Sequence, residues 1–395
     1  MLSAAGTRAP VAWRERLAVH ADEGAAAAQL PGAGTIAEAI VLSTCERFDV
    51  YAVASDAERA ERELVRWVAE RSGSPAPAVA NRVRTFHGRA AARHVIATAA
   101  GLHSAVLGEH EILGQVRRAR DRAARAGATG PVLDRLAVDA LRAGRRARAT
   151  TSLGRGSLSV LSVGLELIAD LCPGTGRRAL VVGSSRTASA ACERLRAFGW
   201  AVAPAADLSA RSPLGTSLHE FHALVTCTGT SGKVVSADAL ADAAGQRGGT
   251  PLVVLDLSVP RDVDPRARYV EGVLLFDVDA LPVVAEPALA SRRAGVADAK
   301  RIVDEELDRF DAWRADQLLA PTIKALRDHV RGVLEDALAE ADERTVERIV
   351  GRILHTPTRR LREARADVRG PASVQLLRWL FGVDGDPGGS AAARP

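Results

Sequence analysis

The sequence predicts an α/β protein with an N-terminal α+β domain, a Rossmann-like domain on a parallel sheet, and a long helix leading into a C-terminal helical domain. Short apolar runs alternate with helical segments between residues 172 and 285, which is typical of a doubly wound sheet. Helical periodicity continues from 286 to about 340. We therefore place the domains at residues 1–150, 151–285 and 286–395.

Composition supports a globular chain. The 395 residues are 47% hydrophobic and 26% charged, which is ordinary for a soluble protein. The sequence has no uninterrupted apolar run of about 18 residues, so we expect no membrane span. The opening MLSAAGTRAPVAWRER lacks a basic-then-apolar signal pattern, and we predict a cytoplasmic protein.

The net charge is +5, and 50 of the 53 basic residues are arginine. Two explanations of the arginine excess are open. One is the codon bias of a high-GC genome, and the other is phosphate binding, because arginine binds phosphate in bidentate fashion. Acidic residues are interspersed almost everywhere. The composition therefore permits an RNA partner without requiring one.

The first domain should hold two strands and several helices. Residues 36–54 contain two strand-like runs broken by the polar insert STCERFD. Residues 89–127 have helical spacing, and 131–170 continue it with an interruption at 152–157. A further helix should begin near Ser159.

The second domain should be a parallel sheet, because buried parallel strands are continuously apolar. The expected strands lie within residues 177–185, 200–206, 222–228, 251–258 and 272–278.

The last domain shows an apolar stripe through Val303, Leu307 and Phe310. We expect Pro321 to kink or restart this helix. The stripe predicts either dimerisation or packing within one chain. The tail from residue 384 should be disordered.

The four cysteines form no CxxC pair, which argues against a zinc ribbon or redox dithiol, and we predict no metal site. Cys172, Cys192 and Cys227 lie in apolar stretches and should be core thiols. Cys45 either is a nucleophile or is a partly buried thiol beside a surface arginine. In an extended segment Arg47 would share its face and would lower the thiol pKa or bind a substrate carboxylate.

A second cluster of polar residues lies between residues 93 and 119, on what the spacing predicts to be an apolar helix. We interpret it as a pocket for a polar substrate or a solvated face, and His219 and His222 as structural. The cluster contains His94, His103, Ser104, Glu109, His110, Glu111 and Gln115.

The glycine turn at 183–188 reads GSSRTA. A dinucleotide fingerprint needs glycine at its middle position, where the backbone approaches the pyrophosphate. Here Ser185 occupies that position, and Arg186 offers partial compensation by charge. Asp207 lies near the end of the next strand.

Together these motifs resemble the glutamyl-tRNA reductases of tetrapyrrole synthesis. The family's STCNR motif stands here as STCERFDVY at 43–51, and its substrate-binding stretch as RHV at 93–95 and GLHSAVLGEHEILGQV at 101–116. Further matches are APVAWRERLA at 9–18 and DLSVPRDVDP at 256–265.

The resemblance implies a function: Cys45 attacks glutamyl-tRNA(Glu) to form a thioester, which NADPH reduces to glutamate-1-semialdehyde, in the first step of 5-aminolevulinate and porphyrin synthesis. It implies that residues 1–150 form the catalytic domain, 151–285 the NADPH-binding domain and 286–395 the dimerisation domain. It also implies a homodimer through the C-terminal helices and glutamate-1-semialdehyde aminomutase as a candidate docking partner.

The resemblance also assigns the site residues. Catalysis falls to Cys45 and His94. The substrate would be held by Thr44, Glu46, Arg47, Ser104, Glu109, His110, Glu111 and Gln115, and the cofactor by Gly183, Ser184, Ser185, Arg186, Thr187 and Ala188.

Three departures from the family pattern carry consequences. Glu46 replaces the usual asparagine and should raise the pKa of Cys45, and Gly6 stands where a histidine is usual. The loop GSSRTA replaces GAGEMG, which predicts weak NADPH binding. The alternative function is therefore a divergent paralogue that binds or deacylates aminoacyl-tRNA with weak or no reductase activity. An ordinary Rossmann dehydrogenase would leave residues 1–150 unexplained.

Overall fold

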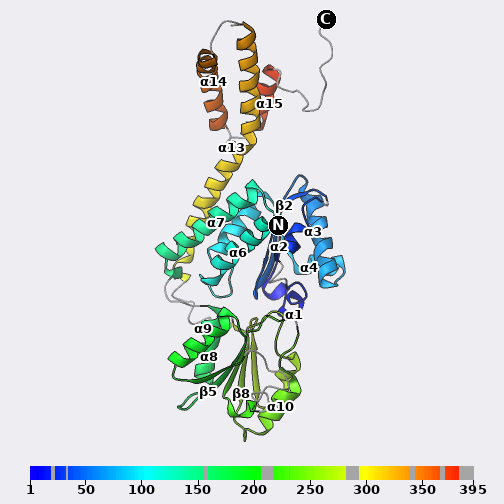
Figure 1. Ribbon diagram of the computed structural model, residues 1–395, viewed down its shortest axis with the longest axis vertical. Coiled ribbons are helices and arrows are strands. Elements are labelled where there is room, and N and C mark those ends of the chain that lie inside the picture. The colour runs from blue at the N-terminus through cyan, green and yellow to red at the C-terminus, as the bar shows by residue number, and fades with distance from the viewer. Residues whose placement is uncertain are drawn as a thin grey trace. The chain divides into compact units, whose positions relative to one another are not determined.

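The computed structural model describes residues 1–18, 23–32, 34–154, 159–205, 217–230, 232–281, 293–337, 343–364 and 370–381. It divides into two compact units, residues 1–307 and 308–395. The first unit holds both sheets (Figure 1). The mixed α/β fold with a parallel sheet confirms the predicted fold class. The predicted boundary at 150 falls inside the first unit and stays a prediction, and residue 285 lies outside the described residues.

The first sheet is antiparallel, in the order β2-β3-β1-β4. Its strands are β1 (Leu2–Ala5), β2 (Ile36–Ser43), β3 (Arg47–Ala54) and β4 (Arg84–Thr85). Ser43 pairs with Phe48 across the β2–β3 hairpin, so the turn between the strands consists of residues 44–46. The predicted break in the strand pattern is confirmed and places Cys45 at the tip of the hairpin, but it is shorter than the insert STCERFD, because Ser43 belongs to β2 and residues 47–49 belong to β3.

Seven helices of the first unit surround this sheet: α1 (Val11–Arg14), α2 (Glu23–Ala28), α3 (Ala57–Ser72), α4 (Ala76–Arg82), α5 (Gly88–Ala99), α6 (Glu111–Arg125) and α7 (Pro131–Thr150). The helices α2, α6 and α7 pack against β2, and the apolar side chains Ile112 and Val116 of α6 are buried there.

The predicted continuous helix over 89–127 is wrong, because residues 100–110 form an irregular connection between α5 and α6. Gly101 and Gly108 both have positive φ, +78° and +74°. A Cβ on Gly101 would lie 2.8 Å from the Cα of Gly108, so the two backbones cross at a distance that other residues do not allow. Ser104 and Glu109 therefore lie on a loop and not on a helix.

The second sheet is parallel, in the order β6-β5-β7-β8-β9. Its strands are β5 (Arg178–Val182), β6 (Ala201–Ala205), β7 (Ala223–Thr226), β8 (Leu252–Asp256) and β9 (Val273–Asp277). Each expected strand is confirmed. The edge strand β6 carries Pro204. Proline lacks the N–H that a central strand uses to pair with its neighbours, so within sheets it occurs on edge strands.

The helices of this sheet are α8 (Val160–Leu171), α9 (Arg186–Ala197) and α10 (Ala237–Gly245). Ser159 caps α8 in a reciprocal pair with Ser162, which confirms the predicted start. Cys172, Cys192 and Cys227 are free thiols buried in one apolar cluster, as predicted. Asp207 and the rest of the segment after β6 lie outside the described residues.

The helices α13 (Val296–Ala337), α14 (Glu343–Ala364) and α15 (Gly370–Leu380) account for the C-terminal part. The helix does not restart at Pro321, since α13 runs through it, and the expected alternative of a kink there stays a prediction. Within the second unit Leu326, Val330, Val346 and Val350 form an apolar core. The tail from residue 384 lies outside the described residues. Among the described helices, none combines the length and apolarity that crossing a bilayer requires.

Candidate functional site

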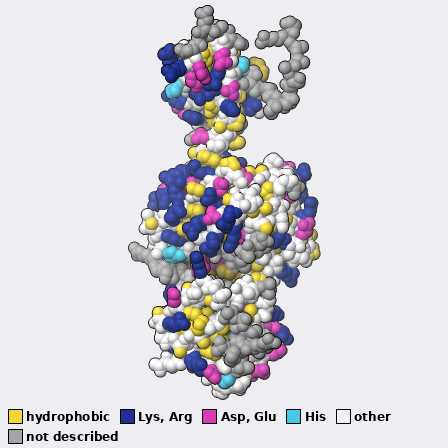
Figure 2. All heavy atoms as spheres, viewed as in Figure 1, with side chains coloured by type: hydrophobic (Ala, Val, Ile, Leu, Met, Phe, Trp, Pro, Cys, Tyr) yellow, Lys and Arg dark blue, Asp and Glu magenta, His cyan; other side chains and the backbone are white. Residues whose placement is uncertain are grey.

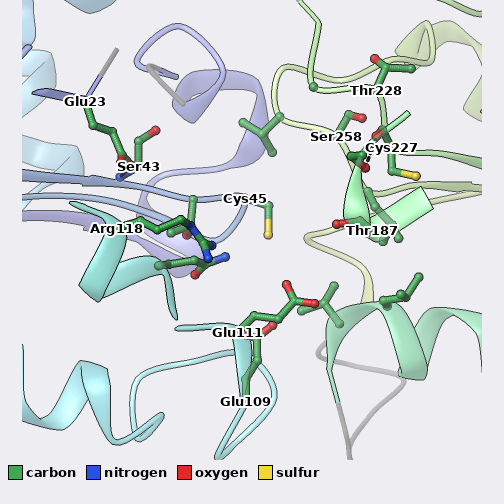
Figure 3. A pocket seen from close by; sticks show the side chains of 18 of the residues that line it. Glu23, Ser43, Cys45, Glu109, Glu111, Arg118, Thr187, Cys227, Thr228 and Ser258 are labelled. Carbon is green, nitrogen blue, oxygen red and sulfur yellow. Dashed lines mark hydrogen bonds between the residues drawn. The ribbon is translucent and has the colours of Figure 1, made fainter. Parts of the chain in front are cut away.

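Cys45 lies in the hairpin turn between β2 and β3. The hydroxyl of Thr44 accepts hydrogen bonds from the backbone amides of Glu46 and Arg47, both at 3.2 Å. The side chain of Arg14 donates to the carbonyl oxygen of Cys45 at 2.8 Å. The turn is therefore held from both sides, and the sulfur projects into a pocket (Figure 3).

The pocket, which we call the thiol pocket, has a volume of about 280 Å³. The N-terminal region contributes the hairpin tip and a face of α6. The parallel sheet contributes the segments that follow β5, β7 and β8. The lining includes Thr44, Cys45, Glu109, Glu111, Gln115, Arg118, Arg122, Ser185, Thr187, Cys227, Thr228 and Ser258. Figure 3 shows Cys45 with Arg118 on one side and Thr187 and Cys227 on the other.

The thiol is strongly stabilised in its protonated form. Burial raises the pKa of Cys45 well above its usual range, and the carboxylates of Glu46, Glu109 and Glu111 raise it further. Arg14 opposes this by lowering the pKa of Cys45. The expected effect of Glu46 on the thiol is thus present, whereas the cation that acts on it is Arg14 and not Arg47.

The carboxyl groups of Glu109 and Glu111, which line the thiol pocket, differ in environment. Glu109 is buried, and its pKa is raised well above normal by burial and by the neighbouring carboxylates Glu46 and Glu111. Burial also raises the pKa of Glu111, but Arg118 offsets part of that rise. Of these two carboxyl groups, Glu109 is therefore the better able to hold a proton near neutral pH.

The structure does not bring Arg47 and His94 into the thiol pocket. Arg47 is buried, lies 3.5 Å from Asp49 and donates to the carbonyl oxygen of His103. His94 packs against Phe86 and His103 with ring centroids 4.8 and 4.6 Å apart, and burial lowers its pKa. The expectation that Cys45 and Arg47 share a face fails because side-chain alternation holds only within a strand, and Cys45 lies in a turn.

A second cavity of about 430 Å³ is lined by the hairpin residues Glu46 and Arg47 and by Arg14 and Ser104, and we call it the polar cavity. Four of its lining side chains carry a buried polar atom that has no hydrogen-bond partner among the described residues. These atoms are Arg14 Nε, Glu46 Oε1, Arg47 Nε and Ser104 Oγ. Buried polar atoms without partners are costly, so this cavity is suited to a small polar group.

The predicted substrate residues are thus divided between two cavities. Thr44, Glu109, Glu111 and Gln115 line the thiol pocket, whereas Glu46, Arg47 and Ser104 line the polar cavity. His110 is exposed at the start of α6 and lines neither cavity.

Sequence reasoning missed three residues that shape the site. Arg14 binds the Cys45 carbonyl, and its signal was the matched segment APVAWRERLA. Arg118 lines the thiol pocket. Asp262 is fully buried and accepts from the Thr228 amide at 2.9 Å and from the Ser258 hydroxyl at 2.5 Å, so it fixes the segments after β7 and β8. Its signal was the motif DLSVPRDVDP.

The sheet side of the thiol pocket fits a nucleotide. The strand order reverses between β5 and β7, and ligands of open parallel sheets bind at that point, outside the carboxyl ends of the strands. Gly183 has φ +135°, and a Cβ there would lie 2.7 Å from the Cys227 carbonyl oxygen, so the first glycine of the loop is required. The N-terminus of α9, which follows, attracts anions.

Ser185, at the middle position, is engaged inside this loop. Its hydroxyl donates to the Cys227 carbonyl oxygen at 3.0 Å and accepts from the Ala188 amide at 3.2 Å, capping α9. Thr187 lines the pocket with it, whereas Ser184 and Arg186 are exposed. The loop keeps the form of a nucleotide-binding turn even though its middle glycine is replaced.

Three family models match the chain. "Glutamyl-tRNAGlu reductase, N-terminal domain" covers residues 2–151, and "Glutamyl-tRNAGlu reductase, dimerisation domain" covers residues 298–383. "Shikimate / quinate 5-dehydrogenase" covers residues 205–284, most of the parallel sheet.

Curated relatives match along nearly the whole chain. A glutamyl-tRNA reductase of Roseiflexus castenholzii is 35% identical and the match covers 95% of this chain and 94% of the relative. One of Chloroflexus aurantiacus is 34% identical, with 96% and 98% covered. The solved structure of glutamyl-tRNA reductase from Methanopyrus kandleri shares the fold, with a TM-score of 0.51, 23% identity and coverage of 97% and 98%. The chain therefore belongs to the glutamyl-tRNA reductase family.

Proposed function

We propose that the protein is an NADPH-dependent glutamyl-tRNA reductase that acts through a thioester at Cys45. One observation carries the proposal: the Cys45 sulfur lies in a single pocket with the residues at the nucleotide-binding edge of the parallel sheet. An acyl group attached to this sulfur would share one cavity with Ser185 and Thr187, the residues that would hold the cofactor. A thiol in a separate cavity would permit acyl transfer or hydrolysis but not reduction.

The first step is acyl transfer from the tRNA. The Cys45 sulfur attacks the ester carbonyl, a carbon–sulfur bond forms, and the terminal ribose oxygen leaves with a proton. The thiol must lose a proton in the same step, because the thiolate is the nucleophile. Glu109, whose raised pKa lets it hold a proton, lies in the pocket to carry it from sulfur to the leaving oxygen.

When bound, NADPH would supply a hydride to the thioester carbonyl carbon. The carbon–sulfur bond would then break and the sulfur would take a proton, so the products are glutamate-1-semialdehyde and the free thiol. Gly183, Ser185 and Thr187 would hold the phosphates of the cofactor. Thr44, Glu111 and Gln115 would orient the glutamyl group in the thiol pocket. The polar cavity, with Arg47 and Ser104, is the alternative place for its side-chain carboxylate.

The alternative function is aminoacyl-tRNA deacylation without reduction, and the replacement of glycine by Ser185 favours it. One assay separates the two: purified protein receives glutamyl-tRNA with and without NADPH. Semialdehyde formed in proportion to NADPH oxidised supports the reductase. Glutamate released at the same rate with and without NADPH would support deacylation and contradict our proposal.

The C-terminal helices carry apolar side chains that are suited to an interface between two copies of the chain. The C-terminal helices expose Leu318, Ile353, Leu376 and Trp379, which are 72%, 49%, 56% and 71% exposed, and apolar side chains at this density favour an interface. We propose a homodimer through these helices. The cytoplasmic location and the docking of glutamate-1-semialdehyde aminomutase stay predictions.

A further inference from the structure

One face of α6 lines the thiol pocket together with Cys45. Glu111, Gln115, Arg118 and Arg122 line the pocket at spacings of four, three and four residues, which is one side of a helix. Near the start of the helix this face carries the carboxyl group of Glu111 and the amide of Gln115. Farther along it carries the guanidinium groups of the two arginines. Arg118 lies seven residues beyond Glu111, or about 10 Å at 1.5 Å per residue.

The two arginines on this face differ in what they bind. Arg122 donates to Glu23 at 2.6 Å, and Glu23 accepts from the backbone amide of Ser43 at 2.9 Å. Arg122 thus supports the end of β2. Arg118 is exposed, and among the described residues no carboxylate lies within ion-pair distance of it, although its charge lowers the pKa of Glu111. Its guanidinium is turned back along the helix over Gly114, where a Cβ would lie 3.2 Å from its Nη1.

Arginines also gather on the surface around this face. Figure 2 shows Lys and Arg side chains concentrated where α6 and α7 lie in Figure 1. On α6, Arg117 and Arg125 are exposed as well. A surface of this kind supplies salt-dependent affinity for a polyanion.

The chemistry of the substrate defines what must lie near Cys45. The ester that the sulfur attacks is on the terminal ribose of the tRNA, and the nearest charge of the RNA is the phosphodiester joining that nucleotide to its neighbour. We infer that Arg118 binds this phosphodiester and so positions the ester at Cys45. The inference rests on the proposed function and adds a subsite for the RNA end of the substrate.

A phosphate at Arg118 could also come from the cofactor. The placement argues against it, because Arg118 and the nucleotide-binding residue Thr187 lie on opposite sides of Cys45 (Figure 3). Arg118 belongs to the α6 side of the pocket, which continues into the arginine-rich surface. The cofactor enters from the sheet side.

The test uses two unreactive competitors in which an amide replaces the ester: 3′-glutamylamido-3′-deoxyadenosine, and the same nucleoside preceded by cytidine through one phosphodiester. Each is titrated against thioester formation from glutamyl-tRNA, in the whole protein without NADPH. We expect the dinucleotide to inhibit the unmodified chain about tenfold more tightly than the nucleoside. Arg118→Ala should reduce this ratio to about one, and Arg118→Lys should leave an intermediate ratio.

Arg117→Ala is the matched control. It removes the same charge from the neighbouring residue, and the side chain of Arg117 does not line the pocket. It should keep the tenfold ratio. Equal weakening of both competitors by Arg118→Ala would assign Arg118 to the glutamyl carboxylate and overturn the inference. An unchanged ratio, or no preference for the dinucleotide in the unmodified chain, would overturn it too.

NADPH binding is measured in the same variants by fluorescence titration. We expect Arg118→Ala to leave the NADPH dissociation constant unchanged. A loss of NADPH affinity with an unchanged competitor ratio would place the cofactor phosphate at Arg118 and reject our assignment. If the unmodified chain forms no thioester from glutamyl-tRNA, the proposed function itself fails, and that result is distinct from any change in the ratio.

Discussion

The guanidinium of Arg14 donates to the carbonyl oxygen of Cys45 at 2.8 Å and to the carboxylate of Asp279 at 2.8 Å. Asp279 follows β9 of the parallel sheet and also accepts from the Val11 amide at 2.7 Å. Arg14 is buried, and it donates to the Ala9 carbonyl oxygen as well. One side chain therefore links the turn that holds Cys45 to the end of the parallel sheet.

We predict that Arg14→Ala lowers both stability and thiol reactivity. Removing a buried donor leaves two backbone carbonyl groups unpaired, which should cost about 2 kcal/mol or more. It also removes the charge that lowers the pKa of Cys45, so alkylation of Cys45 by iodoacetamide should slow at pH 8. Urea unfolding and the alkylation rate measure the two effects.

Arg16→Ala is the control for Arg14, because Arg16 is an exposed arginine two residues away. It should change stability by less than about 0.5 kcal/mol and leave the alkylation rate unaltered. If Arg14→Ala matches this control in both measurements, Arg14 does not position the turn.

The reactivity of Cys45 should depend steeply on pH. Burial and Glu46 raise the pKa of the thiol, so the thiolate fraction is small at neutral pH and the alkylation rate should still be rising above pH 9. Glu46→Asn removes one negative charge and should shift this profile to lower pH. At pH 8 the rate should rise roughly three- to tenfold, since one pKa unit is a factor of ten in thiolate.

The control for this change is Glu58→Gln, which removes an exposed carboxylate on α3 and should not move the profile. A plateau below pH 8 in the unmodified chain would contradict the raised pKa of Cys45.

The sequence predicted β2, β3 and the five parallel strands, the break at Cys45 and the first glycine of the loop, because these depend on local patterns of apolar and turn residues. It did not predict the short strands β1 and β4 of the first sheet. It did not predict that residues 100–110 leave the helix, since the cause is the close crossing of Gly101 and Gly108. The sequence also did not predict the role of Arg14. That role depends on a contact with Cys45, 31 residues away in the chain, and on a second contact with Asp279, 265 residues away. Contacts of that range have no local signal.

Cofactor affinity should respond to Ser185. The sequence departs from the glycine pattern there, and the extra Cβ should hold the pyrophosphate away from the backbone. We predict that Ser185→Gly tightens NADPH binding several-fold in a fluorescence titration. Loss of the cap of α9 should lower stability by only a few tenths of a kcal/mol, because glycine is an acceptable N-cap residue.

Ser184→Gly makes the same change at the neighbouring exposed position and should leave NADPH affinity as it is. Binding that is equally tight with serine or glycine at position 185 would show that the middle position of this loop does not limit the cofactor.

The proposed function requires the sulfur of Cys45 to take the glutamyl group from the tRNA. The most direct measurement is intact-protein mass spectrometry after a single turnover with glutamyl-tRNA in the absence of NADPH, followed by peptide mapping. Cys227→Ser is the matched variant, because Cys227 is the other thiol lining the pocket and burial raises its pKa to about 12. We predict one glutamyl group on Cys45 that hydroxylamine removes, present in the Cys227→Ser variant and absent from Cys45→Ser. A glutamyl group that persists in Cys45→Ser, or semialdehyde production by that variant, would contradict it.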